Sequence, residues 1–252
     1  MNGPLRLVNH LRRYNYHPRS DAHSNAVCLG ILDDLLDHCT PFAQKAARGE
    51  IVASLNHTVT FNYEEWNIDL AVGPPPSAPQ PPREGERIRM AVPALVELAI
   101  EVKGVMTEHG KARKNRFRDL QAFHGHAHQY NPRTIAVGVV VVNIAPAFWS
   151  PLRPHEDITI HDDIERIGAE TVALYRSLPL RHAGPEGVGL EAVSVIVVRH
   201  DNLLANPNPP ADAPPRVKTE LVTRHPAPQV GDPLHYATMI HRTCAAYRER
   251  WA

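Results

Sequence analysis

A run of nine residues, LVELAIEVK at positions 95–103, alternates between large apolar side chains and other residue types and is followed by a glycine. This alternation predicts a β-strand, on which side chains switch faces at every residue. Glu101 and Lys103 are therefore expected on one face, together with Glu97 and Ala99, while the apolar side chains between them take the other. The carboxylate and the ammonium group would lie about 7 Å apart along the strand.

A second short apolar strand is expected upstream, at residues 67–72. We expect Ile68 and Leu70 on one of its faces and Asp69 on the other, where Asp69 is free to face Glu101 if the two strands pair. Mg²⁺ prefers oxygen ligands and typically binds through one or two carboxylates, several waters and a substrate phosphate. Asp69 and Glu101 are therefore the candidate metal ligands for Mg²⁺, with Mn²⁺ as an alternative ion.

Lys103 completes a set of three candidate catalytic residues with Asp69 and Glu101. A metal held by the two carboxylates would polarise a phosphoryl oxygen and lower the pKa of a bound water. Lys103 would orient that water or neutralise charge that develops during displacement. The sequence leaves open whether the lysine acts as a base or as an electrostatic stabiliser.

At these three residues the chain resembles the PD-(D/E)XK phosphodiesterase superfamily, the fold of many restriction endonucleases and of repair or defence nucleases. Asp69 matches the first acid of the motif, with Ile68 in place of the proline, and Glu101 and Lys103 match its E-x-K half. The resemblance covers roughly residues 20–142. It implies an α/β fold with a mixed central sheet flanked by helices, in an αβββαβ core, and Mg²⁺-dependent cleavage of DNA.

In many members of this superfamily an early helix adds a carboxylate or polar group to the metal site. A helix is expected from about residue 23 to 38, and Asp21, His23 and Asn25 at its start are candidate accessory residues. No glutamate stands there, and a helix cap beside a solvated histidine is the interpretation that we favour. Three acids farther along, Asp33, Asp34 and Asp37, are expected on the solvated face of the same helix.

A long basic helix is expected from about residue 111 to 130, ending before Asn131-Pro132. Acids are nearly absent from its first turns, so ion pairs within the helix do not explain its cations. Phosphate binding is the interpretation that explains them. Gln121 is a candidate for a further polar contact. The candidate nucleic-acid-binding residues are Lys111, Arg113, Lys114, Arg116 and Arg118.

Three alternatives stay open. An acid two residues before a lysine is frequent by chance, and a half-exposed edge strand with a solvated Glu101 and Lys103 is the plain explanation. His124 and His128, spaced i and i+4, suggest a zinc-dependent hydrolase, although no third ligand is evident and helix-terminal histidines are the favoured interpretation. The third is a non-catalytic nucleic-acid-binding or interaction protein that retains the fold. It predicts that Asp69, Glu101 and Lys103 do not converge, or that a salt bridge among them occupies the site.

The composition fits a protein that buries a sizeable core. The chain has 252 residues, of which 43% are hydrophobic, and a formal net charge of zero, so nucleic-acid binding would need a local charge asymmetry. No run approaches the length of a membrane span, and no secretion signal is evident. Three cysteines without metal-ligand spacing are expected to be reduced thiols in a cytoplasmic protein.

A single domain is expected over residues 1–252, with its core at about 20–200. Residues 1–19 would form an arm that contacts nucleic acid or packs on the domain or a second subunit. A proline-rich insertion at 74–82 would lie between the two motif strands, and a second proline-rich linker at 207–215. The remaining expected elements are strands at 51–61 and 134–142, the latter beside Glu101, a helix at 162–180, a last strand at 192–198 and a C-terminal helix at about 232–250.

Together these features predict a Mg²⁺-dependent DNA endonuclease. Its partner would be DNA, no membrane contact is expected, and a homodimer is a candidate assembly. The resemblance implies a bacterial restriction or other defence role, which the residues themselves do not show.

Overall fold

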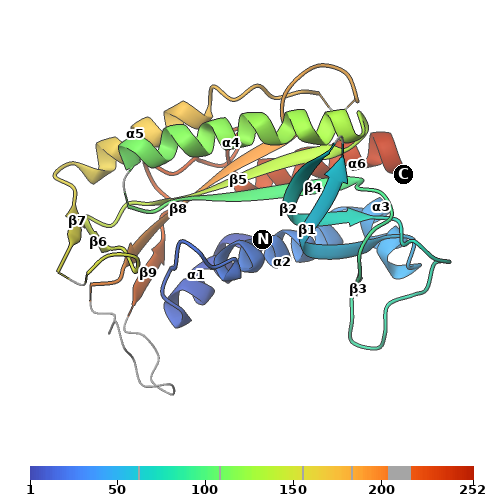
Figure 1. Ribbon diagram of the computed structural model, residues 1–252, viewed down its shortest axis with the longest axis horizontal. Helices are drawn as coiled ribbons and strands as arrows, with labels where there is room; N and C mark the ends of the chain where they lie inside the picture. Colours follow the sequence, from blue (N-terminus) through green and yellow to red (C-terminus); the bar gives the residue numbers. More distant parts are fainter. Residues whose placement is uncertain (62, 108, 155, 183, 204–216) are drawn as a thin grey trace.

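The computed structural model describes residues 1–61, 63–107, 109–154, 156–182, 184–203 and 217–252. Within this part of the chain, a mixed seven-stranded sheet has the order β3-β1-β2-β4-β5-β8-β9, with helices on both of its faces (Figure 1). The strands of this sheet are β1 Val52–Phe61, β2 Glu64–Gly73, β3 Arg89–Met90, β4 Leu98–Val105, β5 Ile135–Asn143, β8 Ala192–Asp201 and β9 Lys218–Leu221. The expected α/β class with a mixed, helix-flanked sheet is confirmed.

The LVELAIEVK run contributes β4, which lies inside the sheet between β2 and β5. It pairs antiparallel with β2 and parallel with β5, where Glu101 is opposite Gly138. All nine residues of β5 are buried, as expected for a β-branched strand covered on both faces. The helix α4 (His109–Tyr130) connects these parallel strands. The predicted strand beside Glu101 and the long helix before it are therefore confirmed.

Two apolar layers sandwich the sheet. On one side lie α1 (Gly3–Arg13), α2 (Ala22–His38), α3 (Thr40–Ala47) and α6 (Tyr236–Trp251), and on the other lie α4 and α5 (Ile164–Tyr175). Each of two helices buries an apolar stripe, which consists of Val27, Ile31 and Leu35 on α2 and includes Leu120 and Phe123 on α4. A separate antiparallel ribbon is formed by β6 (Ala147–Trp149) and β7 (Ile158–Ile160).

Several boundaries differ from the predictions. Residues 1–19 contain α1, which packs on α2, as in the alternative that this arm packs on the domain. The helix expected at 162–180 is α5 and ends at Tyr175, before Leu178-Pro179. The strand at 192–198 is not the last, because β9 follows it and pairs antiparallel with its end. The second proline-rich linker, at 207–215, lies outside the described residues.

Asp34 is not on a solvated helix face, and that prediction is wrong. Its side chain is buried and accepts hydrogen bonds from the backbone N–H groups of Asn2 (2.7 Å) and Gly3 (2.9 Å) and from the hydroxyl of Tyr236 (2.8 Å). The carboxylate satisfies backbone donors at the start of α1, which have no partner within that helix. It thereby links α1, α2 and α6.

The prediction that all three cysteines are thiols is also wrong. Cys39 and Cys244 form a disulfide with Cα atoms 5.5 Å apart, and Cys28 is a buried free thiol. The bond joins the end of α2 to α6 across 205 residues, a separation that gives no pattern in the sequence. In the described part of the chain, no helix is both long and apolar enough to cross a membrane.

Candidate active site

The site forms where β2 leaves β4. The two strands pair only through Leu70–Val72 and Leu98–Ile100. The part of β2 that precedes Leu70 pairs only with β1, as a two-stranded ribbon. Asp69, the residue directly before Leu70, is where the pairing with β4 has stopped. The neighbouring position of β4 is Glu101.

A local irregularity in the β1–β2 hairpin sets the direction of Asp69. Asn56, opposite Asp69, has a φ of 50°, a left-handed conformation that asparagine tolerates better than most residues. Ile68 faces the α4 layer, whereas Leu70 faces the α2 layer. The expectation that Ile68 and Leu70 share a face is therefore wrong, because the strand changes its face assignment at Asp69.

Asp69 points toward β4 as a consequence. Its carboxylate accepts a hydrogen bond of 2.7 Å from the backbone N–H of Val102. This carboxylate satisfies a donor on β4 beyond the point where β2 stops pairing with it. Asp69 and Glu101 are thus brought together, as the sequence predicts, through a contact with the backbone rather than by a shared sheet face.

Glu101 and Lys103 do lie on one side of β4, and their side chains form an ion pair. Glu101 is only 8% exposed. Burial and the charge of Asp69 raise the pKa of Glu101 to about 7, against the opposing effects of Lys103 and the Asp69 backbone. The pKa of Asp69 is also raised by burial, although the Val102 N–H group and Lys103 oppose the increase.

The start of α2 approaches the two carboxylates. The charge of Asp21 contributes to the raised pKa of Asp69, while a hydrogen bond from Ser24 opposes it. One turn later, burial and the charges of both carboxylates raise the pKa of the Cys28 thiol. The helix therefore places an acid and a hydroxyl beside Asp69. Asp21, one of the candidate accessory residues, therefore lies close to the site. Ser24, one helical turn after Asp21, lies there too.

The other two candidate accessory residues turn elsewhere. The ring of His23 lies 4.8 Å from that of Tyr16, and burial lowers the pKa of His23 to about 4, so the imidazole is neutral at pH 7. Asn25 lines a cavity of about 330 Å³ between α1 and α2, with Arg6 and His10. Neither residue shares the contacts of Asp69.

Tyr16 is a neighbour of the site that the sequence did not single out. Its hydroxyl lies 3.2 Å from the place that a Cβ on Gly104 would take, next to Lys103 in the chain. A side chain at position 104 would require the Tyr16 hydroxyl to shift by a few tenths of an ångström. The only hint in the sequence is the glycine that follows the LVELAIEVK run. Nothing in the local sequence connects that glycine to Tyr16.

The solvated-edge explanation does not hold for Glu101 and Lys103. The structure contains such a pair elsewhere, Lys218 and Glu220 on the edge strand β9, whose side chains are 75% and 48% exposed. The corresponding values for Lys103 and Glu101 are 23% and 11%. The same spacing therefore gives a solvated pair on the edge strand and a buried pair on β4.

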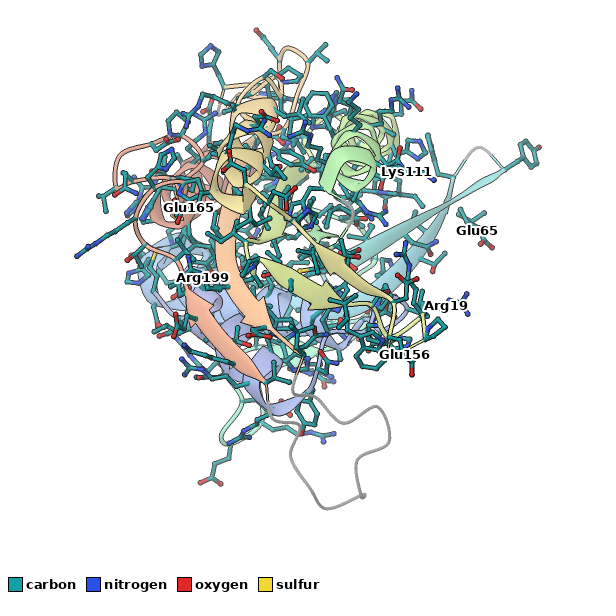
Figure 2. The ribbon with its side chains drawn as sticks, turned by 90° about the vertical axis from the view of Figure 1, so that its left-hand side faces the viewer. Arg19, Glu65, Lys111, Glu156, Glu165 and Arg199 are labelled. Carbon is teal, nitrogen blue, oxygen red and sulfur yellow. A yellow bond between two sulfur atoms is a disulfide. The ribbon has the colours of Figure 1, made fainter. Side chains whose placement is uncertain are left out.

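The basic half of α4 is at the surface beside the C-terminal end of β4. Lys111, Lys114 and Arg118 are exposed and form no ion pair with the residues that the structure describes. Two of the five predicted phosphate-binding cations do have partners, since Arg113 contacts Glu170 at 3.0 Å and Arg116 contacts Asp119 at 2.8 Å. Figure 2 shows Lys111 on the same side of the molecule as Arg19 and Glu65. Gln121 is exposed on the same helix.

The two histidines suggested as zinc ligands belong to a buried ion cluster. Their rings are 6.0 Å apart, and His128 Nε2 lies 3.3 Å from Glu191 Oε1. Arg181 and Arg250 also contact this carboxylate oxygen, at 3.0 and 2.8 Å. Among the described residues, no group of three or more His, Cys, Asp or Glu side chains is arranged so that it could hold a metal ion. His128 thus meets an acid that two arginines already neutralise, and His124 lies beside His128.

The carboxylates at β2 and β4 do suit a divalent cation. Asp69 and Glu101 offer oxygen atoms and lie near each other, Glu101 is buried and Asp69 is partly buried, and the pKa of each is raised. A divalent cation would relieve the repulsion between their ionised forms. Two carboxylates, with waters and a phosphate as the remaining ligands, match the coordination habits of Mg²⁺.

Comparison of the chain with protein-family models, with curated proteins and with solved structures gives no match.

Proposed function

We propose that the protein is a Mg²⁺-dependent endonuclease that hydrolyses DNA phosphodiester bonds. One observation carries the proposal, namely that Asp69, Glu101 and Lys103 converge where β2 separates from β4. The order α2-β1-β2-β4-α4-β5 supports it, because it follows the αβββαβ core of the restriction-endonuclease-like fold that the resemblance implies, with α3 and β3 as additions. A restriction or other defence role is the setting that we propose with it.

Each group has a task in this proposal. Asp69 and Glu101 would hold Mg²⁺, which when bound polarises a phosphoryl oxygen and lowers the pKa of a water ligand. Lys103, next to Glu101, neutralises negative charge on the reacting phosphate or orients the attacking water. Asp21 adds negative charge behind Asp69. The exposed cations of α4 hold the phosphates on either side of the scissile bond.

A non-catalytic nucleic-acid-binding protein with this fold is the second candidate, and a specific observation favours it. Lys103 forms an ion pair with Glu101, which occupies the carboxylate that a metal would need. The two functions differ in what they predict for added metal. A nuclease exchanges the ion pair for a metal contact, whereas a non-catalytic protein keeps the ion pair.

Cleavage assays distinguish the two functions. Plasmid DNA and bacteriophage genomes, both modified and unmodified, are incubated with Mg²⁺, Mn²⁺ or EDTA. We expect metal-dependent fragments from the wild type and at least a 100-fold slower reaction for Glu101→Gln and Lys103→Ala, the scale for loss of one charge-stabilising group. No cleavage under any condition would favour the non-catalytic protein, and cleavage that survives both substitutions would place the active site elsewhere.

Two matched variants control for effects on folding. Glu97→Gln alters a buried glutamate at the start of the same strand, whose carboxylate contacts Lys45 and Tyr247. Lys218→Ala removes the lysine of the exposed pair on β9. Both should cleave at wild-type rates per folded molecule. A similar loss in Glu97→Gln would mean that the assay reports stability rather than chemistry.

The phosphate contacts of α4 are tested by the salt dependence of binding. Each phosphate contact contributes about −0.9 to the slope of log affinity against log salt for duplex DNA. Removing the three exposed cations of α4 that form no ion pair with the described residues, Lys111, Lys114 and Arg118, should therefore flatten the slope by about 3. A control with the same net charge removes three exposed cations elsewhere, Arg48, Lys218 and Arg248. An equal change in both variants would show that net charge, and not α4, sets the affinity.

A further inference from the structure

The β1–β2 hairpin beyond Asp69 has two faces of different character. We call residues 56–61 and 63–68 the ribbon. On its inner face, the Trp66 ring lies 5.6 Å from Phe123 and 6.0 Å from Tyr130, and Phe61 lies 5.9 Å from Tyr130. These aromatic contacts hold the ribbon against the second half of α4. The ribbon therefore projects from the sheet with a supported inner face and a free outer face.

The outer face carries hydrogen-bonding side chains and no cations. Its exposed residues are Thr58, Thr60, Glu65 and Asn67. Thr58 lies opposite Asn67 and donates a hydrogen bond of 2.7 Å to its Oδ1 atom, which orients the exposed amide group of Asn67. No lysine or arginine occurs anywhere in residues 52–73. A surface without cations is unsuited to binding phosphates.

These side chains suit the edges of bases. Asparagine pairs with adenine, glutamate accepts from the amino group of cytosine, and threonine contacts several bases. The major groove of duplex DNA admits a two-stranded β-ribbon. Phosphate contacts position a protein on DNA and base contacts specify the sequence, and here the cations are on α4 while the base-reading groups are on the ribbon.

We propose that the ribbon enters the major groove of duplex DNA and reads base pairs next to the cleavage point, an inference that rests on the proposed nuclease function. The ribbon is continuous with the strand that carries Asp69. Asn67 and Glu65 precede Asp69 by two and four residues, or about 7 and about 13 Å along β2. With about 3.4 Å per base pair, the bases read lie about two to four base pairs from the scissile phosphate. Figure 2 shows Glu65 on the same side of the molecule as Lys111.

The test separates reading from cleavage by using a protein that binds without cutting. Glu101→Gln is incubated with a pool of duplex oligonucleotides that have a randomised centre, and bound sequences are recovered and counted. The same selection is made with Glu101→Gln carrying Asn67→Ala, Glu65→Ala or Thr58→Val. We expect Glu101→Gln to enrich a motif, and each added substitution to relax one position while affinity for the unselected pool changes less than twofold.

Asn9→Ala, which alters an exposed asparagine on α1, is the matched control and should leave the motif unchanged. A motif that survives all three ribbon substitutions, or DNA binding without any enrichment, would overturn the reading role and leave the nuclease function standing. If the ribbon substitutions change the enriched motif but the wild type never cleaves DNA, the reading role would stand and the nuclease function would be refuted. Absence of DNA binding in every variant would refute both.

Discussion

Replacing Glu101 by glutamine should stabilise the protein and, under the proposed function, slow cleavage at least 100-fold. The substitution preserves the shape of the side chain and removes a charge that is unfavourable in the folded state. Burial, followed by the charge of Asp69, raises the pKa of Glu101 from 4.5 to about 7. At about 1.4 kcal/mol per pKa unit, the ionised carboxylate costs about 3 kcal/mol of folding free energy.

The effect has a defined pH dependence. Because the pKa of Glu101 is higher in the folded than in the unfolded state, the folded state holds the proton more tightly between pH 4.5 and about 7. Wild-type stability should therefore fall as pH rises through this window and level off above it. Glu101→Gln lacks this loss, so the two proteins should be similar at pH 4.5 and differ by about 3 kcal/mol at pH 8. Because the pKa of Asp69 is also raised, the stability of both proteins should still fall with rising pH, with a smaller slope.

Urea and thermal unfolding at the two pH values measure the difference. For a chain of this length, about 3 kcal/mol corresponds to a rise in melting temperature of about 6–12 °C for Glu101→Gln at pH 8. Mg²⁺ should raise the melting temperature of the wild type at pH 8 and leave that of Glu101→Gln unchanged, because only the wild type has both carboxylates. A less stable Glu101→Gln at pH 8 would refute the reasoning, since it would show that the ion pair with Lys103 outweighs the cost of burial.

Two further predictions concern buried pairs outside the site. Although burial raises the pKa of Glu191, its contacts with His128, the Ala136 backbone and Arg250 lower the pKa below the usual range, so Glu191→Gln should destabilise the protein by about 3–5 kcal/mol at pH 7 in urea unfolding. An unchanged midpoint would mean that the guanidinium groups find other partners. Reduction of the Cys39–Cys244 disulfide, which closes a loop of 205 residues, should cost up to about 5 kcal/mol, and Cys39→Ser should be insensitive to reductant. Equal stability with and without reductant in the wild type would contradict this.

The sequence was sufficient where structure depends on local patterns. The alternation that places Glu101 and Lys103 together needs only the two-residue period of a strand, and the structure confirms it. Asp69 was correctly paired with Glu101, but its orientation was not. That orientation depends on Asn56, thirteen residues earlier on the partner strand, whose φ of 50° accompanies the change of face. A pattern within residues 67–72 contains no information about such a partner.

Buried polar groups were the least predictable feature, for a related reason. Asp34 lies in a run of helix acids, and sequence alone places such residues on the solvated side. It is buried because backbone donors of residues 2 and 3 and the hydroxyl of Tyr236 reach it from far along the chain. Cys39 and Cys244 were missed in the same way. In each case the partner that makes burial favourable is more than 30 residues away.

What distinguishes Glu101 from Glu191, another buried carboxylate, is how completely its charge is neutralised by neighbouring groups. Glu191 has two arginines, a histidine and a backbone N–H group around it, and the pKa of this carboxyl is lowered despite burial. Glu101 has one lysine and a second carboxylate nearby, and its pKa is raised. The same fold can neutralise a buried acid fully, so the incomplete neutralisation at β4 is a local property of this site. A carboxylate left in that condition gains most from an added cation, which is why we propose metal binding at Asp69 and Glu101 and a stabilising role for Glu191.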